Sequence, residues 1–187
     1  MPNHFINYNV QLFRGMSKEE VDELIECQRT KFQRYDKGSM ILNTGDKIQY
    51  FGVINKGRAS LVTYDEDGNR MFLSSLREGD LFAESIILSG INISPVDLLA
   101  ETDVEIMYID YNRLTMPCKK LCIKHMIFLR NLLKIISDKN IYLQNKLRIL
   151  SKRTLREKIL AYIYLQGEKL APNKYKLHIN RAELADY

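Results

Sequence analysis

The sequence predicts an α+β fold in which an N-terminal β jelly roll leads into one long helix and a small basic end. Three observations predict it. Glycines punctuate residues 31–110 at nearly even intervals, apolar residues recur every seven positions between Cys118 and Leu150, and basic residues concentrate after Cys118. With 187 residues and 45% hydrophobic content, the chain can form one ordinary domain plus a small second one.

The first element is a short helix. Ser17 and Glu20 have the spacing of a capping box, ahead of the apolar pattern Val21, Leu24 and Ile25. Cys27 falls in the last turn of this helix, where we expect a small buried side chain.

The next 80 or so residues have the short, punctuated pattern of an all-β module. Gly45, Gly57, Gly68 and Gly79 are spaced 12, 11 and 11 residues apart, and Asp67-Gly68 is a hairpin signal. We expect roughly eight strands, with the clearest at residues 49–54, 59–64, 71–76, 97–102 and 104–109. The effector domain is predicted to span residues 1–117.

Residues 79–88 interrupt this β pattern with a short helix that is predicted to begin near Ala83. The amides at a helix N-terminus can cradle an anion. The surrounding charges disfavour anion binding, because residues 78–112 contain eight acidic residues and no Lys, Arg or His.

Residues 118–150 are predicted to form a single helix that pairs with a second copy. Leu129, Ile136, Leu143 and Leu150 recur at intervals of seven, the seam of a two-stranded coiled coil. The predicted dimer interface consists of Leu129, Leu132, Ile136, Asn140, Leu143, Leu147 and Leu150. Asn140 would cost stability there but could set the register. The alternative is an amphipathic helix that lies on its own domain.

The charge distribution divides the chain into an acidic and a basic part. Residues 1–118 contain 12 basic and 18 acidic residues, a balance of −6, whereas residues 119–187 contain 16 and 5, a balance of +11. A basic segment attached to a dimerising helix favours binding to the phosphate backbone of nucleic acid. The alternative is a solvated helical face that carries Lys and Arg for solubility.

One cluster could carry metal or redox chemistry. Cys118, Cys122 and His125 lie at i, i+4 and i+7 on one helix face, although cysteines there are more often part of a core. No cysteine precedes Cys27 and no histidine lies between His4 and His125, so we expect no resident metal or cofactor. The chain has neither an export signal nor a run of about 18 apolar residues, which predicts a cytoplasmic protein without membrane contact.

Together these features resemble the cyclic-AMP receptor/FNR family of bacterial transcription regulators over nearly the whole chain. The resemblance rests on the β-roll glycines, on Gly79-Asp80-Leu81-Phe82-Ala83-Glu84, on the long helix, and on residues 151–160. In cyclic-nucleotide-binding members a Gly-Glu-Leu motif is followed by an Arg-Ser or Arg-Thr pair. Here the glutamate is kept as Glu84, whereas the glycine is Ala83 and Ser94-Pro95 takes the place of the pair.

This departure implies an effector other than cyclic AMP, because losing a charge-assisted contact to a buried phosphate costs a few kcal/mol. The resemblance assigns effector binding to Glu84 and Ser85, with Arg130 of the long helix as a substitute cation. The alternative for Glu84 and Ser85 is loop and helix capping.

The basic end resembles the start of a winged helix-turn-helix, predicted over residues 151–187. The family pattern places a phosphate contact at Thr154, in a helix that is predicted to open at Ser151 with a basic first turn. Lys152, Arg153 and Arg181 are expected to position the DNA backbone with it, without specifying sequence. Residues 167–175 are expected to form a turn and short wing, residues 176–179 a strand, and Asn180 and Glu183 cap a further helix. We expect the recognition helix to be missing from these 187 residues, as in a truncated chain.

The leading hypothesis is a homodimeric, DNA-binding transcription regulator that senses a small effector and contacts RNA polymerase if it is an activator. The alternative is a non-DNA-binding regulatory module of the same fold that controls a partner protein. An enzyme is not expected, because no nucleophile–base pair, metal triad or carboxylate dyad can be assembled in the β module.

Overall fold

The computed structural model describes residues 6–115, 123–172 and 174–177. They form two compact units, Met1–Leu133 and Lys134–Tyr187, each of which is described by itself. The elements of the first unit are η1 (Gln11–Phe13), α1 (Lys18–Gln28), β1 (Lys31–Tyr35), β2 (Met40–Leu42), β3 (Tyr50–Lys56), β4 (Ala59–Tyr64), β5 (Arg70–Leu76), β6 (Leu81–Phe82), α2 (Glu84–Leu88), β7 (Asp97–Ala100), β8 (Val104–Asp110) and α3 (Tyr111–Thr115). Helix α4 (Ile123–Leu150) runs from the first unit into the second, followed by α5 (Leu155–Gln166), β9 (Glu168–Ala171) and β10 (Lys174–Lys176).

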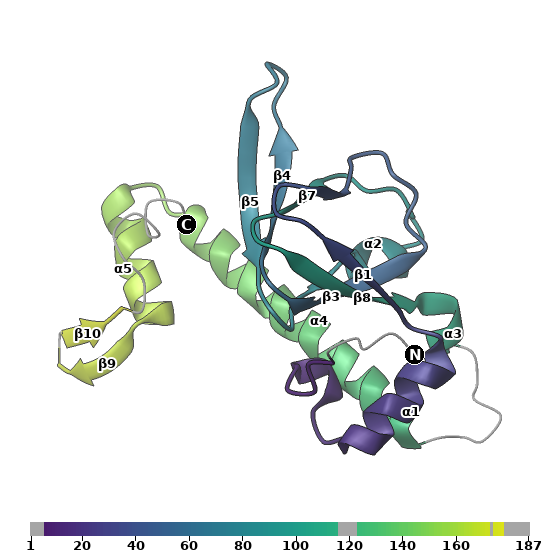
Figure 1. Ribbon diagram of the computed structural model, residues 1–187. Coiled ribbons are helices and arrows are strands. Elements are labelled where there is room, and N and C mark those ends of the chain that lie inside the picture. The colour runs from purple at the N-terminus through teal and green to yellow at the C-terminus, as the bar shows by residue number, and fades with distance from the viewer. Residues whose placement is uncertain (1–5, 116–122, 173, 178–187) are drawn as a thin grey trace. The chain divides into compact units, whose positions relative to one another are not determined.

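The first unit is the predicted antiparallel jelly roll. Two four-stranded sheets, in the orders β1-β8-β3-β6 and β2-β7-β4-β5, form a roll that is visible in Figure 1. The main core lies inside it and consists of Ile54, Ala59, Leu76, Phe82, Leu98, Ala100, Val104 and Ile106. The expected eight strands and the hairpin at Asp67-Gly68, which joins β4 to β5, are confirmed.

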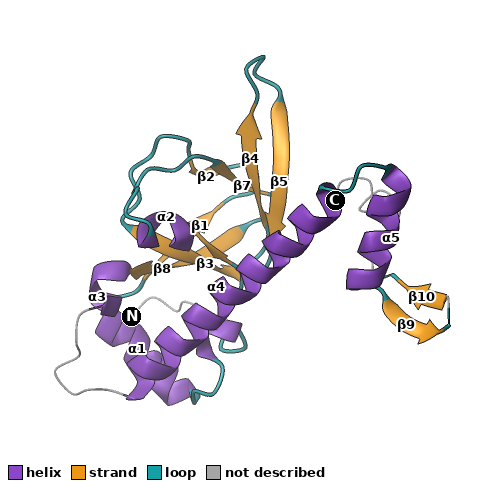
Figure 2. Ribbon diagram, turned by 180° about the vertical axis from the view of Figure 1, so that it is seen from behind, coloured by secondary structure: helices purple, strands orange, loops and turns teal. Residues whose placement is uncertain are grey.

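A second core covers the outer face of strand β8. Met107 and Ile109 alternate with the roll-facing residues of β8, and they meet Phe13, Leu24 and Phe128 around a cavity of only about 10 Å³. The strand is therefore buried on both faces, as alternating side chains allow. Figure 2 shows α1 and the beginning of α4 gathered on this side of the roll.

The N-terminal segment is held by local caps and by α4. Ser17 and Glu20 form the predicted capping box at the start of α1. The Phe13 and Phe128 rings lie 6.3 Å apart, and Asn131 Nδ2 donates to the backbone oxygens of Leu12 and Arg14. The expectation of a buried Cys27 was wrong, because this side chain is exposed.

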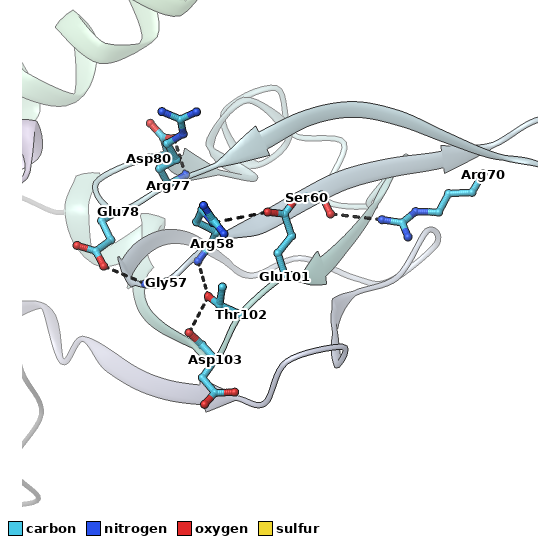
Figure 3. A network of polar contacts seen from close by, with 10 residues as sticks. All are labelled: Gly57, Arg58, Ser60, Arg70, Arg77, Glu78, Asp80, Glu101, Thr102 and Asp103. Carbon is cyan, nitrogen blue, oxygen red and sulfur yellow. Dashed lines mark hydrogen bonds and ion pairs between the residues drawn. The ribbon is translucent and has the colours of Figure 1, made fainter. Parts of the chain in front are cut away.

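Three turns at one end of the roll are tied together by polar contacts (Figure 3). The Gly57 amide donates to Glu78 Oε1 at 3.1 Å, and the Arg58 amide donates to Thr102 Oγ1 at 3.0 Å. Gly57 has a φ of +89°, and a Cβ there would lie 2.2 Å from the Asp103 carbonyl oxygen. This position therefore requires glycine for its backbone angle and for the space it leaves.

Gly57→Ala should lower the free energy of unfolding by about 2–4 kcal/mol, because it adds a left-handed backbone cost to a clash with backbone. Chemical denaturation would measure this. Gly68→Ala is the matched control, since Gly68 has a φ of +80° but nothing within 4 Å of its Cβ position. That variant should lose only about 1 kcal/mol. Equal losses in the two variants would contradict the role assigned to the Gly57 contact.

Candidate functional site

Residues 83–95 hold the places of the family's Gly-Glu-Leu motif and Arg-Ser pair, and we call them the cassette. They begin at helix α2. The prediction of a short helix near Ala83 is confirmed, with Ala83 as N-cap in the left-handed conformation at φ 63°. Ile87 N donates to Ala83 O at 3.1 Å, so this residue also starts the helical hydrogen bonding. Alanine here adopts a backbone conformation that favours glycine, the residue of the family motif.

The three predicted effector residues are in different environments. Glu84 is buried, with 3% of its surface exposed, whereas Ser85 next to it is exposed. Arg130 is also exposed, on α4, and it makes no hydrogen bond or ion pair with any described residue. The structure therefore gives Arg130 no contact with Glu84 or Ser85, and the effector role of these three residues stays a prediction.

Ser94, in the place of the family's arginine, is part of a closed turn. Only 1% of its surface is exposed, and its hydroxyl donates to Val96 O at 2.6 Å. Its amide donates to Asp46 O at 2.9 Å, and its carbonyl accepts from Gly45 N at 2.8 Å. The Thr44 amide donates to the Asp97 carboxylate beside it. This turn satisfies its own polar groups and offers no cation to a phosphate.

His125 is the described member of the predicted cysteine–histidine cluster, since Cys118 and Cys122 lie outside the described residues. The ring is buried, and its Nε2 lies 2.7 Å from Gln28 Nε2 and 3.9 Å from Cys27 Sγ. Burial lowers the pKa of His125, so the neutral ring accepts from the Gln28 amide. Within the described ranges, no three His, Cys, Asp or Glu side chains are grouped so that they could hold a metal.

Helix α4 carries a continuous stripe with seven-residue spacing, which we call the α4 stripe. Its members alternate in steps of three and four: Met126, Leu129, Leu133, Ile136, Asn140, Leu143, Leu147 and Leu150. Leu133, Leu143 and Leu147 are 57–67% exposed, which is unusual for leucine. Asn140 Oδ1 accepts from Gln144 Nε2 at 2.7 Å, one turn along the same helix.

Leu132 does not belong to this stripe. It is 3% exposed, next to Asn131, which bonds the N-terminal segment. Leu132 therefore has little surface to offer a second chain, and Leu133 takes its place in the repeat. Met126 and Leu133 could have been found in the sequence by extending the seven-residue spacing from Asn140 towards the N-terminus.

The basic segment begins differently from the prediction. The helix begins at Leu155 rather than Ser151, with Thr154 as N-cap in a capping box with Glu157. Lys152 and Arg153 precede the helix instead of occupying its first turn, and both are exposed. Thr154 Oγ1 accepts from Glu157 N at 3.2 Å, and its hydroxyl hydrogen can still be donated.

The rest of this unit is a short hairpin. Strands β9 and β10 pair antiparallel in the region where a turn and short wing were predicted. The Tyr164 and Tyr175 rings meet edge to face at 5.6 Å, which attaches the hairpin to α5. Arg181, Asn180 and Glu183 lie outside the described residues.

None of the helices in the described parts of the chain combines the length and the hydropathy that crossing a membrane requires.

Comparison with known proteins agrees with this architecture. Residues 32–120 match the family described as "Cyclic nucleotide-binding domain". The chain is 28% identical over 80 residues to the cAMP-activated global transcriptional regulator CRP of Pasteurella multocida, covering 43% of this chain and 38% of that protein. It is 26% identical over 105 residues to human cGMP-dependent protein kinase 2, covering 54% of this chain and 13% of the kinase. The chain thus spans well under two thirds of the length of these relatives.

The structural comparison extends over more of the chain. The crystal structure of the Thermus thermophilus catabolite activator protein is similar with a TM-score of 0.62 and 23% sequence identity, over 75% of this chain and 63% of that one. At this identity the likeness concerns the fold. Residues 32–120 thus match the cyclic nucleotide-binding domain family, and the chain shares the fold of a bacterial catabolite activator protein over three quarters of its length.

Proposed function

We propose that this protein is a homodimeric, DNA-binding transcription regulator whose β domain senses a small effector other than cyclic AMP. The observation that carries the proposal is the exposed α4 stripe, followed directly by a capped helix with basic residues at its start. An exposed leucine stripe needs a partner, and exposed cations at a helix N-terminus suit a phosphate. Both features lie in a chain with a regulator fold.

The dimer would form along α4. A seven-residue repeat keeps its side chains facing a second helix, and Asn140 would specify register within this apolar seam. The pairing of two identical helices gives an isologous interface and relates the two basic ends by a two-fold axis. Half-sites about one helical turn of DNA apart would then match the protein.

The DNA contact would be to the backbone. Lys152 and Arg153 are exposed cations, and the Thr154 hydroxyl can donate to a phosphate oxygen at the N-terminus of α5. Such contacts position a protein on the duplex without reading base edges. Effector binding would alter the placement of the two basic ends, with the hinge near residues 150–153.

The proposal that the effector is not cyclic AMP rests on the cassette. Ser94 is enclosed in its own turn, and Arg130 has no described partner that would orient it towards Glu84. Within residues 78–112 a phosphodiester would meet no cation, because this segment contains only acidic charges.

A second candidate is a regulatory domain that controls a partner protein, and the match to a cGMP-dependent protein kinase supports it. The basic segment discriminates between the candidates, because a domain that only contacts protein does not require exposed cations at the start of α5.

Leu143→Asp combined with Leu147→Asp should convert the dimer into a single chain of 21.9 kDa, because the seam would bury four carboxylates. Light scattering coupled to size exclusion would measure the mass. Ile141→Asp is the matched control, since Ile141 is 57% exposed on the same helix but outside the α4 stripe. A monomeric wild-type chain, or a double variant that stays dimeric, would refute the assigned interface.

Lys152→Gln combined with Arg153→Gln should weaken binding to duplex DNA of any sequence. The slope of log affinity against log salt should become shallower by about 2 for each chain that contacts DNA, since about one counterion is released per phosphate contact. Fluorescence anisotropy over a salt series would measure both. Lys37→Gln, at an exposed lysine of the β domain, should change neither. An unchanged slope in the double variant would remove these residues from the DNA contact.

Calorimetric titration with cyclic AMP should show no binding with a micromolar Kd, because the cassette supplies no fixed cation. A micromolar Kd would contradict the proposal. If Arg130→Gln then abolished that binding, Arg130 would be the missing cation and the effector could be a cyclic nucleotide after all.

A further inference from the structure

A pocket of about 290 Å³ lies in the β domain and reaches Phe82 and Ala83, the two residues directly before Glu84. Its lining comes from β1, β2, residues 47–50, the β6–α2 junction and β8. None of Glu84, Ser85 and Arg130 lines it. The volume is at the lower end of the range of about 300–1,000 Å³ for small-molecule sites, so it suits a ligand of one or two rings.

The inner wall of this pocket is aromatic and rigid. Phe82 is 5% exposed and lies against Gly52, where a Cβ would come within 2.1 Å of its ring. Tyr108 packs edge to face on Phe82, with centroids 6.2 Å apart, and its hydroxyl lies 2.8 Å from that of Tyr35. Burial and this hydrogen bond raise the pKa of Tyr108, so its hydroxyl stays neutral. These contacts form a preorganised apolar surface.

The outer rim carries two cations. Lys31 Nζ donates to Tyr50 Oη at 3.1 Å and lies 4.6 Å from the Tyr50 ring centroid, which holds it at the rim. Lys47 forms an isolated β-bridge with Ile93, and the next amide, that of Ile48, donates to Asn92 O at 2.9 Å. The backbone that carries Lys47 is therefore fixed.

The charge at the pocket is unbalanced. No lining residue is acidic, and neither Lys31 nor Lys47 forms an ion pair with any described carboxylate. This is notable in an acidic β domain, where lysines would readily find partners. A cavity with aromatic walls that two lysines line without an acidic partner is complementary to an anion with an apolar body.

We propose that this pocket binds a small aromatic carboxylate, with the ring against Phe82 and Tyr108 and the carboxylate between Lys31 and Lys47. The aromatic walls favour a flat ring, and two lysines without an arginine suit a single carboxylate rather than bidentate recognition of a phosphodiester. This binding would need neither DNA nor a second chain, so it does not depend on the proposed regulator function.

The test uses the full chain with 2-naphthoate as probe and neutral 2-naphthamide as its near-isostere. Naphthoate should bind saturably with one site per chain, about tenfold tighter than the amide, because only the carboxylate meets the lysines. Lys31→Gln and Lys47→Gln should each weaken naphthoate binding by about three- to tenfold and leave amide binding unchanged. Amide NMR shifts should change at residues 47–50 and 82–83.

Lys37→Gln is the matched control, because Lys37 is exposed on the same domain but does not line the pocket. It should bind naphthoate as the wild type does. Equal affinity for the two probes, no saturable naphthoate binding at millimolar concentration, or insensitivity to both pocket lysines would overturn the proposal. The proposal would also be overturned if Ser85→Ala or Arg130→Gln abolished naphthoate binding while Lys31→Gln and Lys47→Gln left it intact. DNA binding is measured separately, so either proposal can fail alone.

Discussion

The burial of strand β8 on both faces is the constraint on which the rest of the β domain depends. Val104 and Ile106 face the roll interior, and Met107 and Ile109 pack beneath the helices. Each such side chain contributes about 1.5–3 kcal/mol when it is removed from water. The strand also pairs with β1 and β3, so its backbone hydrogen bonds are satisfied on both edges. One strand thereby joins the two cores.

This arrangement gives a physical connection between the proposed ligand pocket and the start of α4. Tyr108 lines the pocket, and its neighbours Met107 and Ile109 contact the small cavity that Phe128 of α4 also lines. A ligand against Tyr108 would therefore press on a strand that is tightly packed against α4. Close-packed elements respond by shifting between discrete arrangements rather than by deforming continuously. The proposed regulator could use this route from effector to helix.

The polar parts of the domain serve the turns rather than a phosphate. Ser94 bonds back to its own turn, and Gly57, Arg58 and Thr102 hold neighbouring turns together. Buried polar groups that are satisfied in this way stabilise a fold, and an incoming anion would have to displace those bonds. Lys31 and Lys47 lie at the pocket, and Lys152 and Arg153 precede α5.

The sequence by itself determined the features that depend on residues close together in the chain. The capping box at Ser17, the Asp67-Gly68 hairpin and the seven-residue spacing of α4 each involve neighbours within a turn or two. Only the tertiary structure decided which face of α4 is covered by the N-terminal segment and which face stays exposed. Leu132 and Leu133 are adjacent leucines, but the N-terminal segment packs on α4 at Asn131 and Phe128, and Leu132 is buried whereas Leu133 is exposed. The pocket likewise required the fold, because Lys31, Tyr108 and Phe82 come from β1, β8 and β6 of one sheet, and Lys47 is placed beside them through its bridge to Ile93. Contacts over such separations arise from packing, and no local pattern in the chain encodes them.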